Sequence, residues 1–220
     1  MKKNNLKKKI DNKGFSVGLG LLDYINPIFY SITVITIISN LKTTMSTSLF
    51  VMFIIGATLS IIFGLTIPTV KLIVGLGLME FKMPVNLVAF VNTGIFISGI
   101  SLLTHVLTIN PVLIVLIILI VVILLFYIYK KTKKINTIAV LIGAVGYVLM
   151  YVSLITIASK AGYSASIVMY AIAIMLFVML CGIGIKANLM NPKIHWVIEI
   201  SNVICQFLVA LSTALLFTFI

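Results

Sequence analysis

The side chains best able to do chemistry in this sequence are polar residues that interrupt long apolar runs. One set near the C-terminus recurs at spacings of three, four and seven residues, which places it on one face of a helix. Its members are His195, Glu199, Asn202, Gln206 and Thr213. A carboxylate and two amides on a helix that is otherwise apolar could bind an ion, a proton or a polar solute.

A second set near the N-terminus repeats this pattern. Asp23 is followed by Asn26 and Tyr30 at the same three- and four-residue steps. Pro27 has no amide proton, so it can kink the helix beside Asp23. If the two helices are neighbours, their acids face a shared polar vestibule on the cytoplasmic side. The candidate substrate-binding residues are Asp23, Asn26, Tyr30, His195, Glu199, Asn202 and Gln206.

A structural interpretation of both polar stripes stays open beside the functional one. Polar side chains on membrane helices also form hydrogen bonds between helices that hold a bundle together. In that case Asp23 and Glu199 would stabilise the fold and bind nothing. The two interpretations differ in whether the acids line a cavity.

The composition shows which elements must position these residues. The chain has 220 residues, of which 62% are hydrophobic and 9% charged, and its mean hydropathy is +1.29. Soluble domains have about 25% charged residues. A soluble protein of this length could not bury so much apolar surface, so we predict an all-α polytopic membrane protein.

Seven apolar runs are long enough to cross a bilayer as helices. They cover about residues 15–39, 46–66, 86–107, 111–129, 136–159, 164–185 and 194–220. They form a single transmembrane domain over 15–220, preceded by a basic cytoplasmic N-terminus over 1–14. In the run at 111–129, the fifteen residues after Pro111 contain no polar side chain, which predicts that this run faces lipid.

The segment at about 68–84 does not fit this pattern. Lys71, Glu80 and Lys82 leave only eight consecutive uncharged residues within it, too few to span a bilayer. We therefore expect an interfacial or re-entrant segment at the cytoplasmic surface. An alternative with six spans has this segment crossing the membrane and the first span beginning after Asp23 and Pro27.

The sixteen lysines predict the orientation, since cytoplasmic segments of membrane proteins are enriched in positive charge. Seven spans with the N-terminus inside and the C-terminus outside place fourteen lysines in the cytoplasm. Only Lys42 and Lys160 are then outside. Lysine without arginine is typical of an AT-rich bacterial genome, so we expect a multi-pass protein of a bacterial plasma membrane. The charge of +12 does not indicate nucleic acid binding, because it is distributed between the spans.

The residue types argue against an enzyme. Asp23 is the one aspartate within an apolar run, whereas intramembrane carboxyl proteases need two. Cys181 and Cys205 have no metal-ligand spacing, and His105 and His195 lie near opposite ends of their spans. We therefore expect no catalytic residues, no metal and no cofactor.

Three functions remain after these exclusions. The first is a small transporter or transporter subunit for a solute, an ion or an amphiphile, with a cytoplasm-facing polar pocket. The second is a non-catalytic accessory protein linked to immunity or secretion. The third is a membrane-embedded enzyme that acts on lipid. The expected partners are the lipid bilayer and other membrane proteins or a second copy of the chain.

Overall fold

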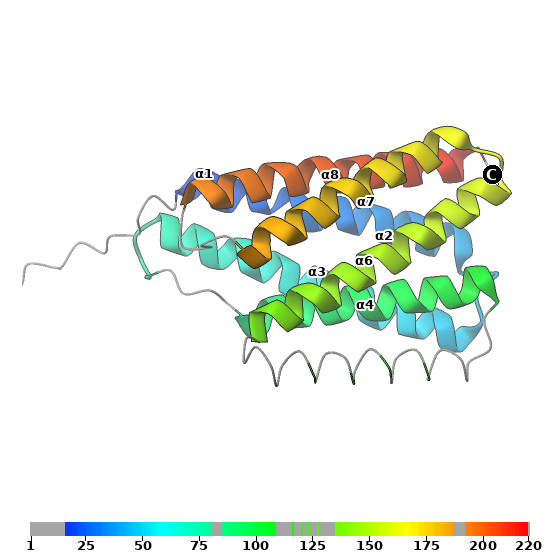
Figure 1. Cartoon of the computed structure of the whole chain (residues 1–220), viewed down its shortest axis with the longest axis horizontal. Helices are drawn as coiled ribbons and strands as arrows, with labels where there is room; N and C mark the ends of the chain where they lie inside the picture. The colour runs from blue at the N-terminus through cyan, green and yellow to red at the C-terminus, as the bar shows by residue number, and fades with distance from the viewer. Residues whose placement is uncertain are drawn as a thin grey trace, which may run out of the picture.

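The fold is an elongated bundle of long helices (Figure 1). It is known from a computed structural model, which describes residues 16–80, 85–108, 135–186 and 192–219, with Leu116, Ile120, Ile123 and Tyr127. Within these ranges the chain is all-helical and has no strand. The helices are α1 (Val17–Asp23), α2 (Ile25–Leu41), α3 (Thr47–Gly75), α4 (Val85–Leu107), α6 (Ile135–Lys160), α7 (Ser164–Lys186) and α8 (Pro192–Thr218).

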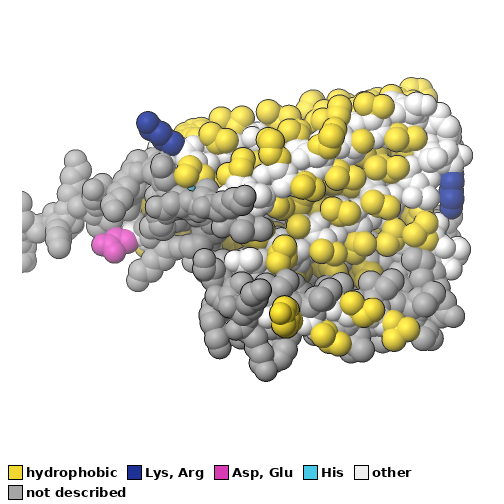
Figure 2. Space-filling view, in the orientation of Figure 1, with side chains coloured by type: hydrophobic (Ala, Val, Ile, Leu, Met, Phe, Trp, Pro, Cys, Tyr) yellow, Lys and Arg dark blue, Asp and Glu magenta, His cyan; other side chains and the backbone are white. Residues whose placement is uncertain are grey.

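Six stretches in the described ranges are long and apolar enough to cross a membrane, with α1 and α2 together forming the first. Apolar side chains cover the side of the bundle, and the charged side chains visible in Figure 2 lie at its two ends. This distribution matches a bilayer that contacts the side of the bundle and leaves the ends in water. The chain thus has the architecture of a multi-pass helical membrane protein.

Five of the observed stretches begin and end within two residues of the predicted runs. The predicted span at 111–129 lies outside the described residues except for the four isolated positions. Those four side chains are exposed and lie three or four residues apart, as on one face of a helix. The basic segment 1–14 lies outside the described residues.

The remaining span is longer than predicted, because α3 continues from Thr47 through Pro68 to Gly75. Residues 68–75 are therefore the last two turns of a membrane helix and not the start of an interfacial segment. Proline is tolerated inside a membrane helix, where it removes a single amide donor. The helix ends where Gly77 adopts φ +74° and the Leu78 amide donates to the Ile73 carbonyl, a left-handed helix cap that favours glycine.

The first stretch is broken beside Asp23, where a kink is expected from Pro27. α1 ends at Asp23, and α2 begins at Ile25 after a turn at Tyr24. The Tyr24 amide donates to the carbonyl of Leu21, three residues back. The Tyr24 hydroxyl is 2.7 Å from the Thr69 hydroxyl on α3. The break thus lies against the last turns of α3.

Close backbone approaches fix the order of α3, α4 and α6. A Cβ at Gly56 would lie 2.6 Å from the Gly94 carbonyl oxygen, and a Cβ at Gly146 would lie 2.6 Å from the Phe96 Cα. The Ser60 hydroxyl on α3 donates a hydrogen bond to the Val91 carbonyl on α4 at 3.1 Å. Small residues at such positions let membrane helices pack closely.

The α7–α8 hairpin is held by a reciprocal pair of hydrogen bonds. The Ser166 hydroxyl donates to the Ser212 carbonyl at 3.1 Å, and the Ser212 hydroxyl donates to the Ser166 carbonyl at 3.3 Å. The largest apolar core fills the half of the bundle around Ile37, Phe53 and Leu102. The buried charges described below lie in the other half.

Candidate functional site

Three charged side chains from three helices meet inside the bundle. The Lys71 ammonium on α3 lies 2.8 Å from Asp23 Oδ2 at the end of α1, and it forms a second ion pair with Glu199 Oε1 on α8. Each of the three residues is at most 7% exposed. We call Asp23, Lys71 and Glu199 the charge triad.

Asn26, one turn after Asp23, joins the two carboxylates from a second side. Its amide nitrogen donates to Glu199 Oε2 at 3.1 Å and to Asp23 Oδ1 at 3.3 Å. Each carboxylate therefore accepts from Asn26 and pairs with Lys71. The Asn26 side-chain oxygen has no hydrogen-bond partner among the described residues, so an acceptor without a donor lies beside the triad.

The packing of α1 against α3 places Lys71 opposite Asp23. A Cβ at Gly20 would lie 2.8 Å from the Leu72 amide nitrogen, so only glycine fits this approach. Next to it, Leu19 and Val74 are fully buried and pack against Trp196 of α8. This small apolar cluster joins the same three helices as the charge triad and excludes water from that end of it.

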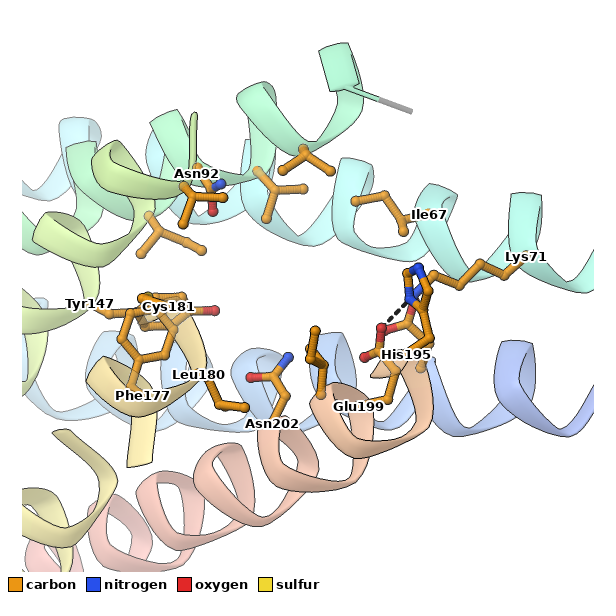
Figure 3. Close-up of a pocket in the computed structure, with 16 residues that line it drawn as sticks. Ile67, Lys71, Asn92, Tyr147, Phe177, Leu180, Cys181, His195, Glu199 and Asn202 are labelled. Carbon is orange, nitrogen blue, oxygen red and sulfur yellow. Dashed lines mark hydrogen bonds and ion pairs between the residues drawn. The ribbon is translucent and has the colours of Figure 1, made fainter. Parts of the chain in front are cut away.

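An interior cavity of about 270 Å³ extends from the triad toward the middle of the bundle. Lys71, His195 and Glu199 lie at one end, whereas Tyr147, Phe177 and Cys181 lie at the other (Figure 3). Apolar side chains that include Ile67, Val91, Ile95 and Leu180 form most of the remaining wall. The cavity thus has a charged end and an apolar, aromatic end.

A second cavity of about 120 Å³ adjoins Asp23 on the α2 side and includes Asn26, Tyr30 and Ser60 in its wall. Asp23 lines both cavities, and so do five other residues. They are Ile67, Val91, Ile95, Tyr147 and Asn202. The triad is therefore bordered by two neighbouring hollows.

The structure brings most of the sequence-predicted site residues together. Asp23, His195, Glu199 and Asn202 line the larger cavity, and Asn26 and Tyr30 line the smaller one. The two polar helices are neighbours, as the Asn26–Glu199 bond requires. Gln206 is buried and lines neither cavity. That these residues bind a substrate stays a prediction.

Lys71 was not among the sequence-predicted site residues, because the lysine distribution assigned it to the cytoplasmic surface with thirteen other lysines. Its ammonium is buried against two carboxylates, and a buried charge is stable only when it is paired. The signal that could have found it is charge balance: two acids within membrane spans need a cation, and Lys71 follows an apolar run by only a few residues.

The triad carries a net charge of −1 when both acids are ionised. In a medium of low dielectric constant, an uncompensated charge is costly, so the site favours a proton or a cation. Among the described residues, no group of three or more His, Cys, Asp and Glu side chains could hold a metal ion. With both acids ionised, one proton or one monovalent cation makes the triad neutral, and this is the chemistry that its charge supports.

No protein-family model, curated protein or solved structure matches this chain. The functional conclusion therefore depends on the geometry of the charge triad and its cavities.

Proposed function

We propose that the chain is a transporter, or a transporter subunit, of a bacterial plasma membrane. The observation that carries the proposal is that both intramembrane acids, Asp23 and Glu199, converge on an interior cavity of about 270 Å³. Ionisable residues inside membrane proteins commonly mark pathways for ions, protons or substrates. A bundle held only by hydrogen bonds between helices needs no hollow beside its charges.

Seven membrane spans accompany this proposal, and the direction of the helices supports the count. The Lys160 ammonium at the end of α6 donates to the Val106 carbonyl near the end of α4 at 3.0 Å, so the two helices run the same way. The end of α4 and the start of α6 therefore lie at opposite ends of the bundle, as a membrane span between them requires. The interval between Thr108 and Ile135 contains the predicted span at 111–129.

Labelling of engineered cysteines tests the orientation. In a variant whose two native cysteines are replaced by alanine, we expect Lys42→Cys and Lys160→Cys to react with a membrane-impermeant maleimide in intact cells. Lys131→Cys should react only after permeabilisation, because the lysine-rich segments face the cytoplasm. The opposite pattern overturns the orientation. Labelling of Lys42→Cys and Lys131→Cys but not Lys160→Cys in intact cells overturns the predicted span at 111–129, because α6 would then carry Lys160 to the cytoplasmic side.

The native Cys181 tests whether water reaches the cavity, as transport requires. In Cys205→Ser membranes, where Cys181 is the remaining thiol, we expect an impermeant thiol reagent to label the protein from the cytoplasmic side. Cys181 lines the cavity, whereas Cys205 is fully buried. The measurement is the extent of labelling in inside-out and right-side-out vesicles.

The matched control is Cys181→Ala, which retains Cys205 and should stay unlabelled. Failure of Cys181 to react from either side would mean that the cavity is closed to water. That result overturns transport and favours the second candidate, an accessory membrane protein in which the charge triad only ties helices together. This alternative is favoured by the position of the ion pairs, whose three buried partners lie on three separate helices.

A further inference from the structure

We propose that the larger cavity binds an amphiphilic organic cation, with its ammonium group at Glu199 and Asp23 and its apolar body toward Tyr147 and Phe177. This inference rests on the proposed function, since it names the substrate class of the same cavity. Three observations carry it: the charge of the triad, the composition of the cavity wall, and the position of Lys71.

The charge of the triad selects the sign of the ligand. One ammonium, that of Lys71, stands against the two carboxylates of Asp23 and Glu199. With both carboxylates ionised, a ligand with a single positive charge makes this cluster neutral, whereas an anion raises its uncompensated charge from −1 to −2. The free energy of burying charge therefore disfavours anions at this end of the cavity.

The wall of the cavity selects an apolar body. Beyond the triad the lining is dominated by aliphatic side chains, and it ends at the rings of Tyr147 and Phe177, whose centroids are 4.4 Å apart. Hydrocarbon or aromatic groups gain free energy by leaving water for such a surface. An inorganic cation would leave this part of the cavity unfilled.

Lys71 shows that the carboxylate pair accepts an ammonium group. Its Nζ atom lies between Asp23 Oδ2 and Glu199 Oε1, the position that a free ammonium ligand would need. Because Lys71 is tethered to α3, it can occupy this position when no ligand is bound. An incoming cation then either shares the Glu199 carboxylate with Lys71 or displaces Lys71 from it. Glu199 borders the cavity.

Asn26 adds an acceptor to the same region. Its side-chain oxygen is buried and has no hydrogen-bond partner among the described residues. A buried acceptor without a donor costs free energy, and a donating ammonium group in the neighbouring hollow would supply that hydrogen bond. Asn26 lines the smaller cavity, which adjoins the larger one at Asp23. The acceptors that face an ammonium ion in the larger cavity are the carboxylates of Asp23 and Glu199.

Three probes of nearly the same shape and different charge test the inference: 2-phenylethylammonium, 2-phenylethanol and phenylacetate. The Cys205→Ser protein in proteoliposomes is treated with a maleimide, and the rate of Cys181 labelling is measured with each probe. We expect the ammonium to slow labelling on the order of tenfold once its concentration reaches about ten times its dissociation constant. The alcohol and the carboxylate should change the rate little.

Glu199→Gln is the decisive variant in the same background. It leaves Lys71 and Asp23 as a neutral pair, so the protein should fold and Cys181 should still react, while protection by the ammonium is lost. Lys42→Met is the control, because Lys42 is exposed at the far end of the bundle, and it should retain full protection. Protection that survives Glu199→Gln overturns the inference.

The remaining outcomes separate this inference from the proposed function. Equal protection by all three probes, stronger protection by phenylacetate, or no protection by the ammonium at millimolar concentration overturns the cation site and leaves an accessible cavity. Absence of Cys181 labelling without any probe overturns the proposed function itself, and the cation site with it.

Discussion

Replacing Lys71 with Met is expected to destabilise the protein by about 3–5 kcal/mol, the usual cost of removing one partner from a buried ion pair. The substitution keeps the length of the side chain and removes its charge. Asp23 and Glu199 would then be two buried carboxylates without a cation. Unfolding in mixed detergent micelles, followed by helical circular dichroism, measures the change.

Two further variants make this prediction specific. Lys42→Met removes an exposed lysine and should change the free energy of unfolding by less than about 0.5 kcal/mol. Adding Asp23→Asn and Glu199→Gln to Lys71→Met should restore most of the stability, because the uncompensated charges are removed. A Lys71→Met protein as stable as the wild type would contradict the buried triad.

Gly20→Ala is expected to destabilise the protein by about 1–3 kcal/mol, as overpacking of a close contact does. The added Cβ would lie 2.8 Å from the Leu72 backbone nitrogen, so α1 must move away from α3. Asp23 and Lys71 lie on these two helices close to the contact, and their ion pair should lengthen. Thermal unfolding in detergent measures the loss of stability.

Gly182→Ala is the matched control for this prediction. A Cβ at Gly182 would meet no atom of the described residues within 4 Å, so the change should be neutral or stabilise α7 by up to about 1 kcal/mol. The same substitution is thus expected to destabilise the protein at Gly20 and not at Gly182. Equal effects at the two positions would show that α1 does not pack on α3 as described.

The sequence was sufficient to predict the helical membrane class and the two polar stripes. Helical periodicity identifies each stripe directly. Asp23 and Glu199 stand out because an acid in an apolar run needs a partner, but a shared vestibule could be predicted only on the condition that the two helices are neighbours. The Asn26–Glu199 hydrogen bond is the contact that meets this condition.

Lys71 could not be predicted by the same reasoning. Pro68 and three nearby charges suggested that the helix ended before Lys71, and the distribution of lysines assigned it to the cytoplasm. Both are local signals, whereas the burial of Lys71 depends on acids that are 48 and 128 positions away in the chain. Only the packing of α1 and α8 against α3 makes a buried lysine stable.

A polar pocket was expected from the two stripes, but the rest of the cavity wall was beyond sequence reasoning for a related reason. Asn92, Tyr147 and Cys181 line the cavity together with the triad, yet none of them has a distinctive spacing. Whether such side chains meet around a hollow depends on how closely the helices approach. Those distances follow from contacts such as Gly56 against Gly94, which pair residues from different helices.

The charge triad also differs from the other interhelical contacts in what it can respond to. Backbone approaches at Gly56 and Gly94 unite α3 and α4, and paired serine hydroxyls unite α7 and α8; neither contact changes with charge. The Lys71–Glu199 ion pair joins α3 to α8. A ligand that weakens this ion pair favours separation of α3–α4 from α7–α8. By thermodynamic reciprocity, separation of these helix pairs strengthens binding of that ligand by the same coupling free energy. If the proposed ligand acts in this way, its occupancy and the relative position of α3–α4 and α7–α8 form one coupled equilibrium.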